Sequence, residues 1–134
     1  MPIQKQISVF LPNRPGTLAH ITGILAEANI NVIALSIHDT VDNAVVRLVL
    51  DNPTKAILLL EQEELYIMEQ DVVVLAVDNH PGILAQIAQK LGRADINIQY
   101  AYCTGTADHT GGCIILKTEQ PDAAMRALRE FEFG

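Results

Sequence analysis

Tryptophan is absent from this chain of 134 residues, and aromatic residues make up only 4% of it. The nine Lys and Arg residues form no basic run, and the formal net charge is −7. Proteins bind nucleic acids through basic patches and aromatic stacking surfaces, and they bind anionic membranes through basic patches. The composition therefore predicts that neither nucleic acid nor a membrane is a partner.

Long apolar runs are lacking too, although 49% of the residues are hydrophobic. No stretch approaches the roughly 20 apolar residues that span a bilayer. The first residues, from Met1 to Lys5, lack the apolar segment of a signal peptide. We therefore expect a cytoplasmic protein in which Cys103 and Cys113 stay reduced.

Motifs of common catalytic sites are also missing. The chain contains no Gly-x-Ser-x-Gly, Walker, His-Glu-x-x-His or Gly-x-Gly-x-x-Gly sequence. The acidic segment at residues 61–64 lies at the expected end of a helix and is interpreted as a solvated surface. His20 and His80 are interpreted as surface residues near helix starts. We predict that the protein is not an enzyme and binds no cofactor.

What the chain does contain is an internal repeat. Residues 11–32 align without a gap with residues 77–98, at a constant offset of 66, and nearly half of the positions are identical. Several shared positions are polar or turn residues that a buried face does not require: Asn13 and Asn79, Asn31 and Asn97, and the Pro-Gly pairs at 15–16 and 81–82. The sequence therefore predicts a duplicated domain that carries a duplicated site, with the two copies at residues 1–70 and 71–134.

The hydrophobic pattern of each copy predicts the order β-α-β-β-α-β. In the first copy we expect strands at residues 5–11, 31–39 and 44–50, and helices at 15–29 and 53–64. Pro15 suits the first turn of a helix. Residues 65–78 form one long strand, bent near Gln70, from which the second copy continues. There we expect helices at 81–94 and 121–130 and strands at 97–104 and 113–118.

This order defines an α+β fold of two ferredoxin-like repeats, each an antiparallel four-stranded sheet with two helices on one face. The Asn-Pro pair at 52–53 matches Gln120-Pro121 at an offset of 68, which places a two-residue insertion in the second hairpin, at residues 105–112. The last strand of the second repeat is truncated, because Tyr66 corresponds to Gly134. Residues 131–133 could form a short strand there, or a neighbouring strand could fill the place; we favour oligomerisation, as a homodimer.

A strand that ends in Asn-x-Pro-Gly-x-Leu-Ala, followed by a helix and Asn-Ile-Asn, resembles the ACT domain. The resemblance covers the whole chain as a tandem pair, short only of the final strand. It implies a sensor of small molecules, usually amino acids, with the ligand at the interface between paired ACT units. The contact positions of the family imply these ligand-binding residues: Asn13, Pro15, Gly16, Thr17, Leu18, Asn31, Asn79, Pro81, Gly82, Ile83, Leu84 and Asn97. The His of the serine-sensing branch is replaced by Leu11 and Val77, so serine is not the implied ligand.

Physical chemistry supports such a site. The free N–H groups of a helix's first turn attract a carboxylate, glycine lets a ligand approach the backbone, and asparagine both donates and accepts hydrogen bonds. The helix terminus contributes roughly 0.3–2 kcal/mol and each charge-assisted hydrogen bond about 1.5–3 kcal/mol. After association costs of several kcal/mol, we expect a dissociation constant between roughly micromolar and millimolar.

Other interpretations of these residues remain open. The Asn, Pro and Gly residues could form turns only, and the sites could be vestigial in a structural dimer. The protein could also be a regulatory subunit that acts by docking an amino-acid biosynthetic enzyme. A metal sensor based on Cys103, His109 and Cys113 is a further alternative, but their spacing does not match that of zinc ligands, so we predict no metal site.

Overall fold

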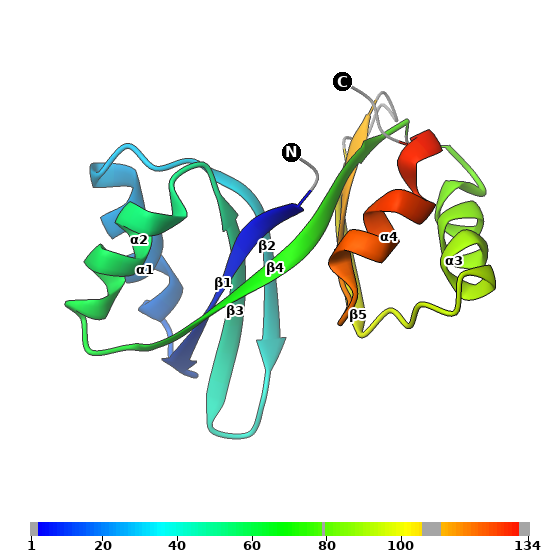
Figure 1. The fold of residues 1–134 in the computed structure, drawn as a ribbon. Helices are drawn as coiled ribbons and strands as arrows, with labels where there is room; N and C mark the ends of the chain where they lie inside the picture. The colour runs from blue at the N-terminus through cyan, green and yellow to red at the C-terminus, as the bar shows by residue number, and fades with distance from the viewer. Residues whose placement is uncertain (1–2, 79, 106–110, 132–134) are drawn as a thin grey trace. The chain divides into compact units, whose positions relative to one another are not determined.

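The computed structural model describes residues 3–78, 80–105 and 111–131 (Figure 1). Its contacts divide the chain into two compact units. The first unit is Lys5–Gln70. The second unit is Asp71–Gly134 together with the beginning of the chain up to Gln4. Each unit contains one copy of the sequence repeat.

The first unit has the predicted β-α-β-β-α-β order. Its elements are β1 (Ile3–Pro12), α1 (Thr17–Glu27), β2 (Val32–Asp39), β3 (Asn43–Leu50), α2 (Pro53–Glu61) and the first part of β4 (Tyr66–Val77). The strands follow the order β2-β3-β1-β4, and β3 is antiparallel to both of its neighbours. Helices α1 and α2 lie side by side on one face of these strands (Figure 1).

Alternation along the strands creates the core of this unit. Ile7 pairs with Leu48 and Val9 pairs with Val46, and because side chains alternate between faces, all four point to the same side. All four are at most 1% exposed. The helices cover them with buried residues at helical spacing: Ile21 and Leu25 from α1, and Ala56 and Leu60 from α2.

The second unit repeats this architecture. It contains residues 71–77 of β4, then α3 (Ile83–Arg93), β5 (Tyr100–Gly105), β6 (Gly112–Lys117), α4 (Pro121–Ala127) and the 3₁₀ turn η1 (Arg129–Phe131). Its strands follow the order β4-β6-β5, with β6 antiparallel to both neighbours. Helices α3 and α4 pack beside each other. The ferredoxin-like α+β fold is thus confirmed in both repeats.

The two cores use corresponding positions almost throughout. Ile21 and Leu25 of α1 correspond to Ile87 and Leu91 of α3, and Leu60 corresponds to Leu128. Two pairs of corresponding positions differ in polarity: Leu50 of the first unit corresponds to Thr118 of the second, and Thr17 corresponds to Ile83. The duplication has therefore preserved the apolar framework more strictly than the residues around it.

The boundaries of all four helices differ from the prediction; α3, for example, begins at Ile83 rather than Pro81, after the left-handed Gly82. Helix α1 begins at Thr17 rather than Pro15, because Gly16 adopts a left-handed conformation with φ of 90° that a helix interior does not contain. Helix α2 ends at Glu61, so Glu63 and Glu64 lie in the turn that follows it. The helix expected at residues 121–130 ends at Ala127 and continues only as η1.

A neighbouring strand, one of the alternatives considered above, lies where the last strand of the second repeat was expected. Residues 3–4 of β1 belong to the second unit, and β1 neighbours β4 in the strand order. The beginning of β1 therefore lies beside the first strand of the second unit. Phe131 lies in η1, so it does not begin a strand, and Glu132 and Phe133 lie outside the described residues. The dimer stays a prediction.

The two hairpins confirm the inserted residues. The last paired residues are Asp39 and Ala44 in the first unit, and Gly105 and Gly112 in the second, which leaves a connection two residues longer in the second unit.

Over the three stretches that the structure describes, no helix combines the length and apolar character needed to cross a membrane.

Candidate functional site

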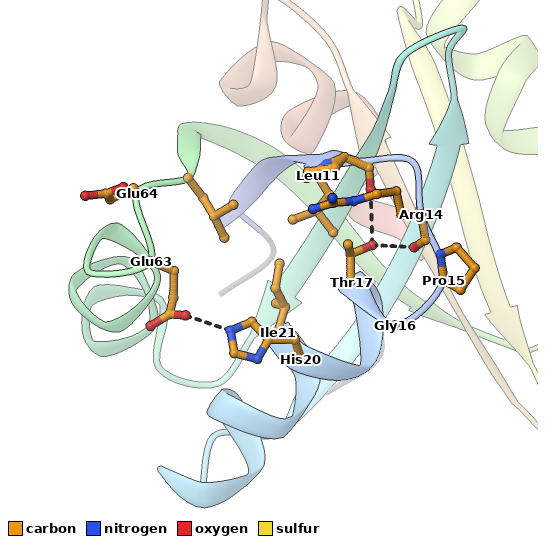
Figure 2. Close-up of a pocket in the computed structure, with 11 residues that line it drawn as sticks. Leu11, Arg14, Pro15, Gly16, Thr17, His20, Ile21, Glu63 and Glu64 are labelled. Carbon is orange, nitrogen blue, oxygen red and sulfur yellow. Dashed lines mark hydrogen bonds and ion pairs between the residues drawn. The ribbon is translucent and has the colours of Figure 1, made fainter.

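A groove of about 810 Å³ opens beside the strand-to-helix turn of the first unit (Figure 2). It lies between the end of β1, the start of α1 and the turn that leads from α2 into β4. Its lining comprises residues 11–12, 14–17, 20–21 and 63–65. Such a volume lies within the range of small-molecule sites.

The first turn of α1 leaves backbone amides open. Gly16 is the N-cap residue, and since it has no side chain, no side-chain hydrogen bond caps the helix. The Thr17 amide makes only a long contact of 3.5 Å to the Arg14 carbonyl, and the first helical hydrogen bond is that of His20 to Gly16, at 3.0 Å. The amides of Leu18 and Ala19 therefore have no partner among the described residues.

The Thr17 hydroxyl is directed toward the turn. It lies 3.2 Å from the Pro12 carbonyl oxygen and 3.1 Å from that of Arg14, both of which accept hydrogen bonds. Figure 2 shows both contacts. Thr17 therefore holds the turn that positions the open amides.

Opposite charges face each other across this groove. Nε2 of His20, on α1, lies 2.6 Å from Oε1 of Glu63, in the turn after α2. The Arg14 side chain extends over Thr17 toward the side on which Glu63 lies, whereas the Glu64 side chain points away (Figure 2). The groove therefore offers the Arg14 guanidinium to an anionic group and the Glu63 carboxylate to a cationic one, and the open amides of Leu18 and Ala19 directly follow its lining residue Thr17.

The corresponding turn of the second unit has the same backbone conformation. Gly82 has φ of 92° and no side-chain cap follows it. The Ile83 amide contacts the His80 carbonyl at 3.3 Å, and the first helical hydrogen bond runs from Gln86 to Gly82, at 3.0 Å. The amides of Leu84 and Ala85 are thus left open within the part of the chain that the structure covers. A smaller cavity, of about 330 Å³, lies beside them.

The structure places about half of the predicted site residues at the two cavities. Pro15, Gly16 and Thr17 line the first cavity, and Gly82, Ile83 and Leu84 line the second. The Leu18 side chain packs against the core of the first unit instead. Pro81 precedes the second cavity, and its carbonyl oxygen lies 3.0 Å from Nδ1 of His80. Asn79 lies outside the described residues.

Asn13 and Asn31 are not brought together within the first unit. Nδ2 of Asn13 donates to Oδ1 of Asp39, at the end of β2, over 2.5 Å. The Asn31 amide donates to Oδ1 of Asp51 over 3.0 Å, at the beginning of β2. The length of β2 separates the two by about 25 Å, so no small ligand held by this unit touches both. Asn97 lines a separate polar cavity of about 190 Å³.

Sequence reasoning missed the charged members of the first groove. His20 and Glu63 were interpreted as solvated surface, and Arg14 was assigned no role, yet all three line the groove. The spacing of Thr17, His20 and Ile21 gives one signal for His20, because these residues share a helical face. Nothing local signals Glu63, which lies 43 residues from His20 in the sequence.

The cysteines of the second unit do not form a shared metal site. Cys103 pairs with Ile114 and Thr104 pairs with Cys113 across the β5–β6 ladder, so the two cysteine side chains point to opposite faces. Burial raises the pKa of the Cys113 thiol. His109 lies outside the described residues, and among those described no three His, Cys, Asp or Glu side chains could hold a metal ion.

Comparison with known proteins gives a family and a fold. Residues 1–132 match the model of the ACT domain pair. A solved protein of Bacteroides thetaiotaomicron shares 29% identity, with a TM-score of 0.88 over 96% of this chain and 88% of that one. The ligand-free regulatory subunit of aspartate kinase from Thermus thermophilus shares 22% identity, with a TM-score of 0.71 over 94% of this chain and 91% of that one. No curated protein sequence matches the chain.

Proposed function

Because this chain belongs to the ACT domain family, as a pair of such domains, we propose that it is a regulatory protein that binds an amino acid. One observation carries the proposal: each repeat begins its first helix with a left-handed glycine and two open amides beside a cavity. In this proposal, the charged and apolar groups around these amides bind and orient the ligand.

The geometry of the first groove suits a zwitterion. A carboxylate at the start of α1 receives hydrogen bonds from the amides of Leu18 and Ala19 and attraction from Arg14. An ammonium group on the opposite side is attracted by Glu63, which already holds the His20 ring at 2.6 Å. In this proposal Asn13 does not contact the ligand. Its side-chain amide donates to Asp39 and thereby fixes the turn between β1 and α1.

A regulatory subunit that docks an enzyme is the second candidate function. The similarity to the regulatory subunit of aspartate kinase favours it. Under this proposal, ligand binding changes the affinity of the chain for an amino-acid biosynthetic enzyme, since a ligand shifts an equilibrium only by binding one state more tightly. Both candidates place the protein in the cytoplasm.

The edge of the first unit supports association of two copies as a homodimer. Strand β2 ends the strand order and pairs only with β3 among the described strands. Its Ile33, Leu35 and Ile37 side chains are 39%, 36% and 49% exposed. A free edge with exposed apolar residues is a site of pairing with another chain. Light scattering should show a dimer that Ile37→Glu dissociates.

A thermal-shift panel of the twenty amino acids tests the ligand-binding proposal. One or a few should raise the melting temperature, with dissociation constants between roughly micromolar and millimolar. Ala19→Pro and Ala85→Pro each remove one open amide at a first-turn position where proline is tolerated. Since a hydrogen bond to a charged group contributes about 1.5–3 kcal/mol, each should weaken binding at its own site about tenfold or more.

Ala19→Ser and Ala85→Ser are the matched controls, because they alter the same side chains but keep the amides. They should bind as the unmodified chain does. A panel in which no amino acid raises the melting temperature contradicts the proposal and favours docking without a ligand.

A further inference from the structure

The cavity of the second unit differs in chemistry from the groove of the first. Its walls include the buried side chains of Val77, Ile83 and Ile114, together with the start of α3 and the ends of β5 and β6. Cys103 pairs with Ile114, which belongs to the core beneath the helices, so the Cys103 side chain shares that face. The cavity is therefore mainly apolar, with the Cys103 thiol on one wall and His80 and Thr104 as its polar members.

Small residues open this space in the second unit. Cys103 stands where the first unit has Ile37, and Gly112 stands where it has Ala44. A third change replaces Asp39, the partner of Asn13, by Gly105. Each change removes atoms from the same end of the hairpin, beside the helix start.

The open amides of α3 border the same cavity. Leu84 and Ala85 are among its lining residues, and neither amide has a partner in the described part of the chain. One end of the cavity thus accepts an anionic group, while the apolar walls exclude charge. Its volume of about 330 Å³ is at the small end of ligand sites.

We propose that the second unit selects an aliphatic amino acid, whose side chain fills the space between Val77, Ile83 and Cys103 while its carboxylate lies on the amides of Leu84 and Ala85. This inference rests on the proposed function and specifies the ligand class of its second site. The first unit, with Arg14, His20 and Glu63 around its groove, does not share this selectivity.

Isosteric ligands measure the selectivity. Valine and threonine have nearly the same shape, as do leucine and asparagine. Because an apolar pocket discriminates against a polar isostere by about 10²-fold at most, the second unit should bind valine about 10- to 100-fold more tightly than threonine, and leucine correspondingly more tightly than asparagine. Titration of the Ala19→Pro variant, whose first site is weakened, reports on the second site.

Thiol protection locates the ligand. Cys103 is exposed and reacts with a thiol reagent such as dithionitrobenzoate, whereas burial raises the pKa of the Cys113 thiol and slows its reaction. Valine or leucine at saturation should slow the modification of Cys103 at least about tenfold. Cys113 also lines the cavity, but its side chain points to the opposite face of the sheet, so the ligand should slow its modification less than that of Cys103.

Two filling variants complete the test. Cys103→Ile and Gly112→Ala restore the residues of the first unit and should each weaken valine binding about tenfold or more. Ala44→Gly, the reverse change at the corresponding position of the first unit, is the control, with unchanged affinity. If valine raises the melting temperature but neither protects Cys103 nor responds to the filling variants, the inference is wrong and the proposed function stands. If no amino acid binds at all, both fail.

Discussion

The two units share a hydrophobic framework but differ in the polar contacts that close their loops. The Ile21, Leu25 and Leu60 positions of the first core recur as Ile87, Leu91 and Leu128, all at most 1% exposed. The comparison shows that packing constrains most buried positions after a duplication, because each lost methylene costs about 1 kcal/mol. Exposed polar contacts contribute less each and are free to change.

The first unit closes its loops with side chains that the second unit lacks. Oδ1 of Asn52 accepts the Lys55 amide at 3.2 Å and caps α2, and the Lys55 ammonium donates to the Ala28 carbonyl at 3.0 Å. Gln120 and Ala123 stand at the corresponding positions, and no side-chain hydrogen bond caps α4. The second unit holds this loop by other contacts: Oγ1 of Thr118 accepts the Gln120 amide at 3.2 Å, and Nε2 of Gln99 donates to Oε1 of Glu119 at 3.2 Å.

The largest expected effect on stability tests whether the two cores are equally well packed. Leu60→Ala and Leu128→Ala each remove a side chain that is 0% exposed, and each should lower the free energy of unfolding by about 2–5 kcal/mol. Urea denaturation measures both. A loss below about 1 kcal/mol for either variant shows that its core is not packed as described.

Next in size is the effect of the left-handed glycines. Gly16→Ala and Gly82→Ala place a Cβ at φ near 90°, which should cost about 1–2 kcal/mol in each unit. Gly23→Ala, inside α1 with nothing within 4 Å of the added Cβ, is the control and should gain about 0.5–1 kcal/mol. Equal losses at both turns sharpen the comparison, whereas no loss at one turn means that its conformation differs.

The helix caps should separate the units. Asn52→Ala removes the cap of α2 and should cost about 1 kcal/mol, whereas Gln120→Ala should change stability by less than about 0.5 kcal/mol. Gln120→Asn introduces the first unit's residue and should stabilise the second unit by up to about 1 kcal/mol. Denaturant midpoints measure these changes in stability. Equal losses for Asn52→Ala and Gln120→Ala would refute the difference in capping between α2 and α4.

The smallest effect is a pH dependence of the second unit's stability that arises at Cys113. The folded pKa of Cys113 is raised by burial, so the unfolded thiol ionises at lower pH than the folded one. The contribution of the neutral Cys113 thiol to stability is complete below about pH 8.5 and is lost as the pH rises through the folded pKa. Melting temperatures between pH 8 and 10 should fall less in Cys113→Ser than in the unmodified chain; identical curves contradict the assignment.

Much of the fold could be predicted from the sequence because it depends on short-range periodicity. Ile21 and Leu25 show the helical spacing, and Ile7, Val9 and Leu11 show the alternation of a strand. The helix start was misplaced because Pro15 suits a first turn as well as the loop before it. The division of β4 at Gln70 follows from long-range contacts, whereas the repeat alone predicts only a boundary near that position.

The site was less predictable than the fold. The Pro-Gly turns identify open amides directly, since glycine cannot cap a helix with a side chain. The role of Asn13 depends on Asp39, which lies 26 residues away, and that of His20 depends on Glu63. Residues that meet only after folding carry no local signal, so the proposed roles of Arg14, Glu63 and Cys103 depend on the structure.

The central claim is that a carboxylate-bearing ligand lies on the open amides at the starts of α1 and α3. Amide chemical shifts recorded during titration with the responding amino acid test it most directly. The account predicts saturable shifts concentrated at Leu18, Ala19, Leu84 and Ala85. Saturable binding that leaves all four amides unshifted while other residues respond contradicts it.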